Sequence, residues 1–154
     1  MNIFFEEHQQ VIRSLIKHDV RFLLIGGYAV MFHGYRRSTG DMDLWLEPTN
    51  ENKKQFLLVL QDLGIEDEDI EVLKEIDFSK HQVFSFGEEP QKIDFITYIN
   101  QVAFEEAYAN KTVADFENLL LPVLNLRELI LSKMNTGRKK DESDVEELQR
   151  LLKK

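Results

Sequence analysis

Two aspartates separated by a single residue, Asp41 and Asp43, are the residues of this sequence whose type and spacing most directly indicate a reactive site. They open the run Asp-Met-Asp-Leu-Trp-Leu, in which polar and apolar residues alternate before the run turns apolar. Alternation is typical of a strand, which places both aspartates on one face with Cα atoms about 7 Å apart. Two carboxylates that project together repel each other unless a cation lies between them. The pair therefore predicts a divalent-metal site, and the alternative is a pair of solvated acids on an edge strand.

A third acid, Asp94, lies among apolar residues in the segment Lys92 to Ile96. A lone carboxylate is costly to bury there unless it faces a metal ion or another partner. Asp94 is therefore a candidate for the same site, although its setting alone does not assign it.

Two glycines, Gly26 and Gly27, follow the apolar run Phe22 to Ile25. They break the strand sharply, and Tyr28 to Phe32 can then form a short helix whose first free N–H groups point back at them. A helix start with no side chains in front of it is a natural anion site. The structural alternative is a tight turn and nothing more.

Arg37 and Thr39 precede the aspartate pair by four and two residues. A guanidinium suits bidentate contact with phosphate groups, so Arg37 is a candidate phosphate ligand, with a solvated loop residue as the alternative. Arg36 is the less favoured neighbour. We interpret His33 as a structural hydrogen-bonding residue rather than a base.

Hydrophobic periodicity, caps and turn residues predict the elements that position these side chains. In chain order we expect a helix over 3–17, strands over 21–25 and 41–46, a helix from Asn50 to Gly64, a short helix over 69–76, a hairpin of 81–86 and 91–97, a helix over 104–109, extended segments over 112–116 and 119–123, a helix capped by Asn125 and a last helix over 144–152. Pro122 confines its segment to a sheet edge or a strand end.

The predicted fold is α/β or α+β, a mixed sheet of about four or five strands flanked by helices. At 154 residues we expect a single domain over 1–154, with about 1–123 forming the α/β core and about 124–154 forming C-terminal helices that fold against the cleft.

Composition narrows the class of protein. Hydrophobic residues at 43% and charged residues at 31% are ordinary for a globular chain. No apolar run approaches the ~20 residues of a membrane span, and the N-terminus lacks the basic region of a signal peptide. The sequence contains no cysteine, which excludes disulfides and thiol chemistry. We therefore expect a cytoplasmic protein with no membrane association.

The formal net charge of −9 argues against broad, non-specific nucleic-acid binding. A local basic groove is still compatible with it. Bases gather at Arg36-Arg37 and at Arg138-Lys139-Lys140, and a polyanion would bind there if it binds at all.

Taken together, these residues resemble a known signature. An apolar residue, Gly26-Gly27, thirteen intervening residues and Asp41-Met42-Asp43-Leu44 resemble the DNA polymerase beta-type nucleotidyltransferase superfamily. More narrowly, Gly26 to Val30, His33-Gly34 and Arg37 to Asp43 resemble small bacterial nucleotidyltransferases related to abortive-infection (AbiEii-like) toxins.

A second motif of that group is a helical lysine followed by Arg-x-Lys-Asp-x-x-Asp at the head of the last helix. The stretches ending in Lys133 and running from Arg138 to Asp144 resemble it. Lys133 as a snorkelling helix residue, and Asp141 as a charge that suits the helix dipole, are the structural alternatives.

The resemblance implies a reaction and a set of roles. Asp41, Asp43 and Asp94 would hold two Mg²⁺ ions, with Mn²⁺ as the substitute, and Asp94 would also serve as the base. Nucleotide triphosphate would be bound by Gly26, Gly27, Arg37, Thr39 and Lys133. Many superfamily members carry serine where this chain has Gly27, which offers only its N–H. An acceptor hydroxyl would attack the α-phosphate, and pyrophosphate would leave.

The sequence leaves the acceptor open between tRNA, a protein and a small hydroxylated molecule such as an antibiotic. The resemblance also implies a toxin–antitoxin component with a cognate partner. The rival hypotheses are a non-catalytic, antitoxin-like module that binds a nucleotide or a partner, and a phosphohydrolase that uses the same metals.

Overall fold

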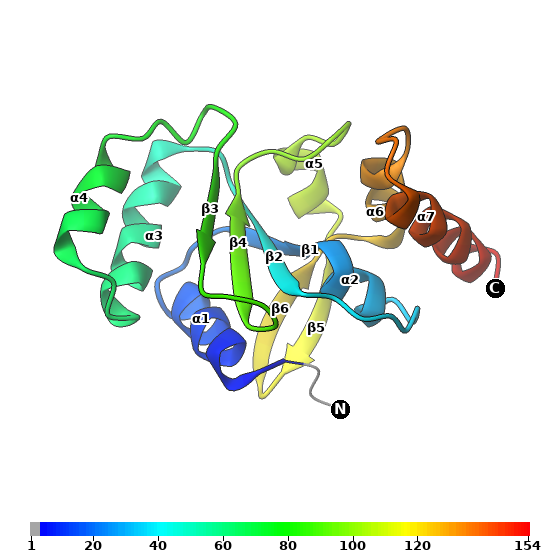
Figure 1. Ribbon diagram of the computed structural model, residues 1–154, viewed down its shortest axis with the longest axis horizontal. Coiled ribbons are helices and arrows are strands. Elements are labelled where there is room, and N and C mark those ends of the chain that lie inside the picture. The colour runs from blue at the N-terminus through cyan, green and yellow to red at the C-terminus, as the bar shows by residue number, and fades with distance from the viewer. Residues whose placement is uncertain (1–3) are drawn as a thin grey trace.

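A six-stranded mixed sheet with helices on both faces forms the centre of the chain, which a computed structural model describes from Phe4 to Lys154 (Figure 1). In chain order the elements are α1 (Glu6–Lys17), β1 (Phe22–Ile25), α2 (Gly26–Phe32), β2 (Asp41–Leu46), α3 (Asn50–Asp62), α4 (Asp67–Lys74), β3 (Val83–Phe86), β4 (Lys92–Ile96), α5 (Phe104–Ala109), β5 (Thr112–Phe116), β6 (Leu119–Val123), α6 (Leu126–Lys133) and α7 (Lys139–Leu152). The predicted helix start at Ile3 lies outside the described residues.

The strand order is β3-β4-β2-β1-β6-β5, so β2 and its neighbours β4 and β1 occupy the middle of the sheet. β2 runs parallel to β4 and antiparallel to β1. The predicted class, a mixed sheet flanked by helices with helices at the C-terminus, is confirmed. The sheet has six strands because the hairpin β5–β6 joins it through a parallel pair between Leu24 and Val123. Pro122 lies one residue before the end of β6.

One face of β2 belongs to the main hydrophobic core. Met42, Leu44 and Leu46 alternate along the strand and are fully buried. On the same face, Phe95 of β4 packs against Phe56 of α3, with ring centroids 4.7 Å apart. The period of two along β2 therefore fixes which side chains are left for the other face.

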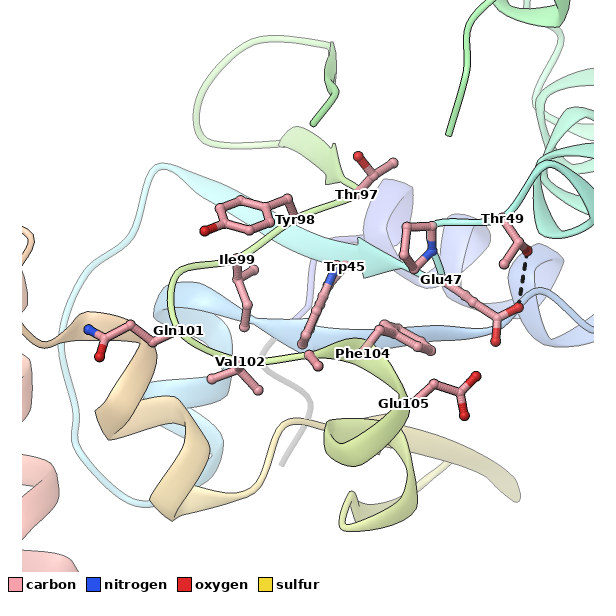
Figure 2. Close-up of a pocket in the computed structure, with 12 residues that line it drawn as sticks. Trp45, Glu47, Thr49, Thr97, Tyr98, Ile99, Gln101, Val102, Phe104 and Glu105 are labelled. Carbon is pink, nitrogen blue, oxygen red and sulfur yellow. Dashed lines mark hydrogen bonds between the residues drawn. The ribbon is translucent and has the colours of Figure 1, made fainter. Parts of the chain in front are cut away.

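The opposite face of β2 presents Asp41, Asp43 and Trp45. Trp45 packs edge to face against Phe104 of α5, with ring centroids 5.1 Å apart (Figure 2). The two aspartates consequently lie on the sheet face that α3 does not cover, next to the region where α2, α6 and α7 gather (Figure 1). None of the helices between Phe4 and Lys154 is long and apolar enough to cross a membrane.

Some helix starts match the prediction and others differ. α1 begins at Glu6, after the non-helical Phe4 and Phe5, and α4 spans Asp67–Lys74 rather than 69–76, because its acidic first turn carries no apolar period. Thr49 and Asn125 cap α3 and α6 by accepting backbone N–H bonds. α2 begins at Gly26 rather than Tyr28, because the glycines form its first turn. α7 begins at Lys139, five residues before the predicted start, because its first turns contain no apolar residue that periodicity could detect.

Candidate active site

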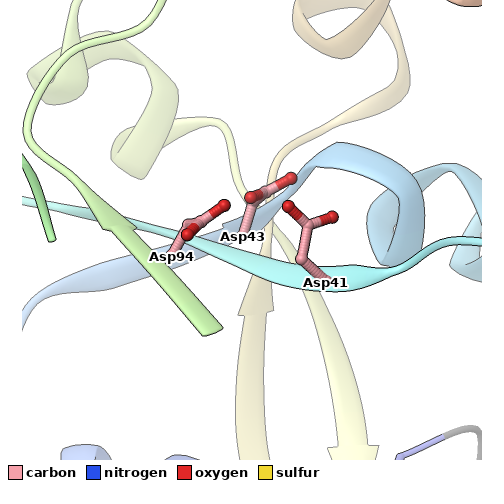
Figure 3. Close-up of side chains that lie close together, drawn as sticks. All are labelled: Asp41, Asp43 and Asp94. Atoms are coloured by element: carbon pink, nitrogen blue, oxygen red, sulfur yellow. The ribbon is translucent and has the colours of Figure 1, made fainter. Parts of the chain in front are cut away.

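Three carboxylates converge on the face of the sheet that α3 leaves open (Figure 3). Asp41 and Asp43 come from β2 and Asp94 from β4, and the parallel register places Asp43 directly beside Asp94. One carboxylate oxygen from each of the three lies within 4.8 Å of the others. The structure thus brings together the three acids that the sequence predicted for one site.

This crowding perturbs the acids of β2. Burial, followed by the charges of Asp41 and Asp94, raises the pKa of Asp43 to about 7. Burial and the neighbouring Asp94 also raise the pKa of Asp41 above its ordinary value. Both shifts have the direction expected when carboxylates share a space with too little positive charge.

Asp94 behaves differently because it has donors of its own. Burial acts to raise its pKa, but a 2.5 Å hydrogen bond from Ser85 Oγ to its Oδ1, its contact with Asp41 and the charge of Lys92 together lower it. Lys92 Nζ lies 3.6 Å from Asp94 Oδ2. Asp94 is therefore the acid of the three that keeps its charge most readily.

The glycine turn lies directly against the acids. Gly26 has a φ of +66°, and a Cβ there would overlap Oδ2 of Asp43. A Cβ on Gly27 would lie 2.7 Å from Oγ1 of Thr39. Glycine at position 26 therefore lets the backbone approach the carboxylate of Asp43, and glycine at position 27 lets it approach Thr39. The Thr39 hydroxyl occupies the space into which a side chain at position 27 would project.

A cavity of about 720 Å³ surrounds the acids and the turn. Its walls include every residue that the sequence proposed for the site: Gly26, Gly27, Arg37, Thr39, Asp41, Asp43, Asp94 and Lys133. Further lining residues are Arg138, Lys140 and Asp141, which the sequence named as a basic cluster and as part of the C-terminal motif, and Glu89, Asn100, Ser132 and Thr136, which it did not propose.

The two basic residues predicted for the site, Arg37 and Lys133, both form ion pairs with Asp144, a buried acid of α7. Lys133 Nζ lies 3.0 Å from Asp144 Oδ2 and 3.3 Å from Asp141 Oδ1. Arg37 places Nε 3.0 Å from Asp144 Oδ1 and donates from Nη2 to Oδ2 at 3.1 Å. We call Arg37, Lys133, Arg138, Asp141 and Asp144 the α7 ion cluster. It fixes the last helix to the edge of the cavity.

Asp141 is the residue whose role the sequence described least well. It is 2% exposed and accepts hydrogen bonds from Thr136 Oγ1 at 2.7 Å and Arg138 Nε at 2.8 Å. Burial acts to raise its pKa, but these donors and Lys133 lower it to about 2. The spacing of Asp141 and Asp144, three apart on one helix face, is the signal that could have predicted a shared partner.

His33 lies outside the cavity wall, as its structural interpretation predicts. Its Nε2 donates to the main-chain carbonyl of Leu124 at 2.8 Å, which ties the end of α2 to the segment after β6. The ring contributes to packing between elements and does not reach the acids.

The cavity therefore contains groups of both charges. Carboxylate oxygens are the ligands preferred by small hard cations such as Mg²⁺. Arg37 and Lys133 line the same cavity and supply N–H groups that bind anionic oxygens. An anion that carries its own divalent cation, such as a polyphosphate, suits both kinds of group at once.

Comparison with known families gives a match over nearly the whole chain. The sequence model of a family described as nucleotidyltransferase of unknown function (DUF6036) matches residues 3–153. No curated protein matches the sequence significantly.

Solved structures give matches of the same overall shape. The lincosamide antibiotic adenylyltransferase LnuA, solved with lincomycin bound, aligns with a TM-score of 0.57 and 14% identity over 97% of this chain and 99% of its own. The antibiotic-resistance factor ANT(2'')-Ia aligns with a TM-score of 0.59 and 11% identity, over 95% of this chain and 82% of its own. An antigenic nucleotidyltransferase-like protein from Paracoccidioides brasiliensis aligns with a TM-score of 0.52 and 16% identity, over 96% of this chain and 75% of its own. At these identities the likeness concerns the fold.

Proposed function

The chain belongs to the DUF6036 family of nucleotidyltransferases, and on that premise we propose that it transfers a nucleoside monophosphate from a nucleoside triphosphate to an acceptor hydroxyl. The observation that carries the proposal is the convergence of Asp41, Asp43 and Asp94 in one cavity with the glycine turn, the buried Lys133 and the half-buried Arg37. Pyrophosphate is the second product.

The carboxylates fit a divalent cation. Their oxygens lie within 4.8 Å of one another, and the pKa of Asp43, raised to about 7, reflects negative charge that a cation would compensate. An all-oxygen donor set suits Mg²⁺, with Mn²⁺ as a substitute, and three carboxylates suffice to hold two ions. When bound, such ions would offset charge on the triphosphate and acidify the acceptor hydroxyl.

The chain's own groups orient the triphosphate. The backbone at Gly27 is free of side-chain atoms and lies next to Arg37 Nη2, so its N–H can approach a phosphate oxygen. Lys133 has three N–H donors, and its two carboxylate contacts leave one for the cavity. Asp144 holds the guanidinium of Arg37 in place while the remaining N–H groups stay available.

Asp94 receives the proton. Its Oδ1 accepts the Ser85 hydrogen bond, and its lowered pKa keeps it ionised at neutral pH. The hydroxyl oxygen bonds to the α-phosphorus, the bond from that phosphorus to the bridging oxygen breaks, and pyrophosphate leaves with the electron pair. The hydroxyl proton passes to Asp94.

The acceptor in this proposal is a small hydroxylated molecule. The net charge of −9 disfavours a nucleic-acid acceptor, and the structural neighbours LnuA and ANT(2'')-Ia act on or bind antibiotics. The resemblance to AbiEii-like toxins implies transfer to tRNA or to a protein instead. A screen of acceptors distinguishes these outcomes from transfer to a small molecule.

The test is a transfer assay with each of the four nucleoside triphosphates, labelled in the α-phosphate, and Mg²⁺. We expect label on an acceptor together with pyrophosphate release, and we expect both to stop in excess EDTA and to return with added Mg²⁺. Free monophosphate without labelled acceptor would identify a phosphohydrolase. Absence of both products with every nucleotide and acceptor would leave the non-catalytic module as the correct function.

The contact between positions 27 and 39 gives a separate prediction. Gly27→Ser places a Cβ 2.7 Å from Thr39 Oγ1, so we expect overpacking of about 1–3 kcal/mol and a roughly tenfold loss of transfer. A Cβ at position 27 would also lie 2.8 Å from Thr39 Cβ, so the double variant Gly27→Ser/Thr39→Gly is needed to remove both threonine atoms, and it leaves one hydroxyl in the same space. We expect it to regain most of the activity and the melting temperature. An equal loss in the single and double variants would show that the hydroxyls are not interchangeable.

A further inference from the structure

A second cavity, of about 530 Å³, shares the lining residue Ile99 with the active-site cavity. Figure 2 shows the side chains that line it. We call it the tryptophan pocket and define it by Trp45, Tyr98, Ile99, Val102, Phe104 and Glu105. The proposed chemistry uses none of these side chains, so the pocket has no assigned role.

The pocket adjoins the acids through the strands that carry them. Trp45 follows Asp43 by two residues on β2, which separates their Cα atoms by about 7 Å. Ile99 lines both cavities and forms the boundary between them. The pocket therefore lies beyond the carboxyl ends of the parallel strands β2 and β4, where ligands of open α/β sheets commonly bind.

The walls of the two cavities differ in charge. Arg37, Lys133 and Arg138 line the active site, whereas no lysine or arginine lines the tryptophan pocket. The latter has an aromatic and aliphatic floor and a carboxylate at Glu105, which is exposed and forms no ion pair within the described part of the chain. Such a wall favours a cation with an apolar body and disfavours phosphate.

A second carboxylate completes the wall, and a donor lies behind it. Glu47 lines the pocket, although its charge is shared with Arg21 at 3.1 Å, and it accepts from Thr49 at 3.2 Å (Figure 2). The indole Nε1 of Trp45, a donor behind this wall, is buried from solvent and has no hydrogen-bond partner among residues 4–154.

We infer that the tryptophan pocket binds the body of the acceptor, and that the acceptor is a small apolar amine that carries a hydroxyl. This inference rests on the proposed function. The apolar part lies against Trp45 and Phe104, the ammonium faces Glu105, and the hydroxyl extends past Ile99 toward Asp94. That hydroxyl then bonds to the α-phosphorus as pyrophosphate leaves, and Asp94 takes its proton.

Binding is tested without any turnover. Trp45 is the one tryptophan of the chain, so its indole N–H signal in an NMR titration reports on this pocket alone. The probes are 2-phenylethylamine, 2-phenylethanol and phenylacetate, which share an apolar body and differ in charge. We expect 2-phenylethylamine to shift the signal at the lowest ligand concentration of the three, about tenfold lower than the concentration of phenylacetate that gives the same shift. A signal that responds equally to all three, or to none, overturns the inference.

Matched variants test whether Glu105 is the carboxylate that the ammonium group of the probe contacts. Glu105→Gln is expected to weaken the amine about threefold and to leave 2-phenylethanol unchanged, a size typical of an exposed ion pair. Glu106→Gln lies on the same helix outside the pocket and is the control, with no change expected. Val102→Phe narrows the pocket and is expected to weaken both probes about tenfold, with circular dichroism to verify the fold. Equal effects of the two glutamate variants would contradict the placement of the ammonium.

The acceptor role is tested separately with 2-amino-1-phenylethanol in the transfer assay. We expect this amino alcohol to be nucleotidylated and Glu105→Gln to raise its KM about threefold with kcat unchanged. Binding of the amine without transfer to any amino alcohol, while other acceptors are labelled, overturns the acceptor assignment. If no acceptor of any class is labelled, the proposed function fails, and the NMR titration still decides whether the pocket binds amines.

Discussion

Asp43→Asn is expected to abolish nucleotidyl transfer and, in the absence of metal, to make the chain more stable. Transfer falls by about 100- to 1,000-fold because the variant removes one of three carboxylates that would hold the cations. Stability rises because loss of solvent, followed by the charges of Asp41 and Asp94, raises the pKa of the half-buried Asp43 to about 7 and so disfavours its charged form. Loss of function with a gain in stability distinguishes a site residue from one that merely supports the fold.

The stability gain has a predictable pH dependence. The folded pKa of Asp43, about 7, lies above its ordinary value of 3.8, so the folded chain binds the extra proton between these values. Well below pH 4 both states are protonated and the wild type carries no penalty. The penalty grows as the pH rises past the unfolded pKa and levels off above about pH 7, at on the order of 4 kcal/mol. The difference between variant and wild type should follow the same course.

Melting temperatures in EDTA from about pH 4 to pH 8 measure this course for the wild type and Asp43→Asn. Asp69→Asn, an exposed acid on α4, is the matched control and should show no such trend. Added Mg²⁺ should raise the melting temperature of the wild type and leave Asp43→Asn unchanged. A variant that melts below the wild type in EDTA near pH 8 would mean that the three acids do not repel one another as described.

The sequence predicted this acid cluster to different degrees. The period of two along β2 is a local property, so the common face of Asp41 and Asp43 could be predicted from residue types alone. That Asp94 lies beside them depends on β4 being the parallel neighbour of β2, after a connection that contains α3, α4 and β3. No local pattern specifies that pairing, and only the family resemblance supplied it.

Burial at the C-terminal end could not be predicted in the same way. Asp141 and Asp144 lie in the first turns of a helix, where local rules describe an acid as a partner of the helix dipole. Their inward orientation follows from the packing of α7 on α6, which places Lys133 within ion-pair distance, while the loop between α2 and β2 brings Arg37 to Asp144. The tryptophan pocket has the same origin, because the segment from Thr97 to Ala103 shows no periodicity and takes its path from the strands and helices around it.

Lys133→Met is expected to destabilise the chain by about 3–5 kcal/mol, because it leaves buried carboxylates with less positive charge. Lys133 is 8% exposed and contacts Asp141 and Asp144, which are 2% and 1% exposed. Methionine retains the length of the side chain, so the loss reports on charge more than on volume. Lys139→Met, at an exposed position of α7, is the control and should change the free energy of unfolding little. Denaturant unfolding of both variants measures the difference.

Adding Asp141→Asn to Lys133→Met separates the structural role of the lysine from its proposed contact with the triphosphate. The second change removes a negative charge that Lys133 had offset, Thr136 and Arg138 can still donate to the amide oxygen at position 141, and the pair between Arg37 and Asp144 stays intact. We therefore expect about 1–3 kcal/mol of stability to return. If Lys133 also binds the triphosphate, transfer by the double variant remains about 100-fold below wild type, with a raised KM for the nucleotide. Recovery of transfer together with stability would show that the lysine acts only by neutralising α7.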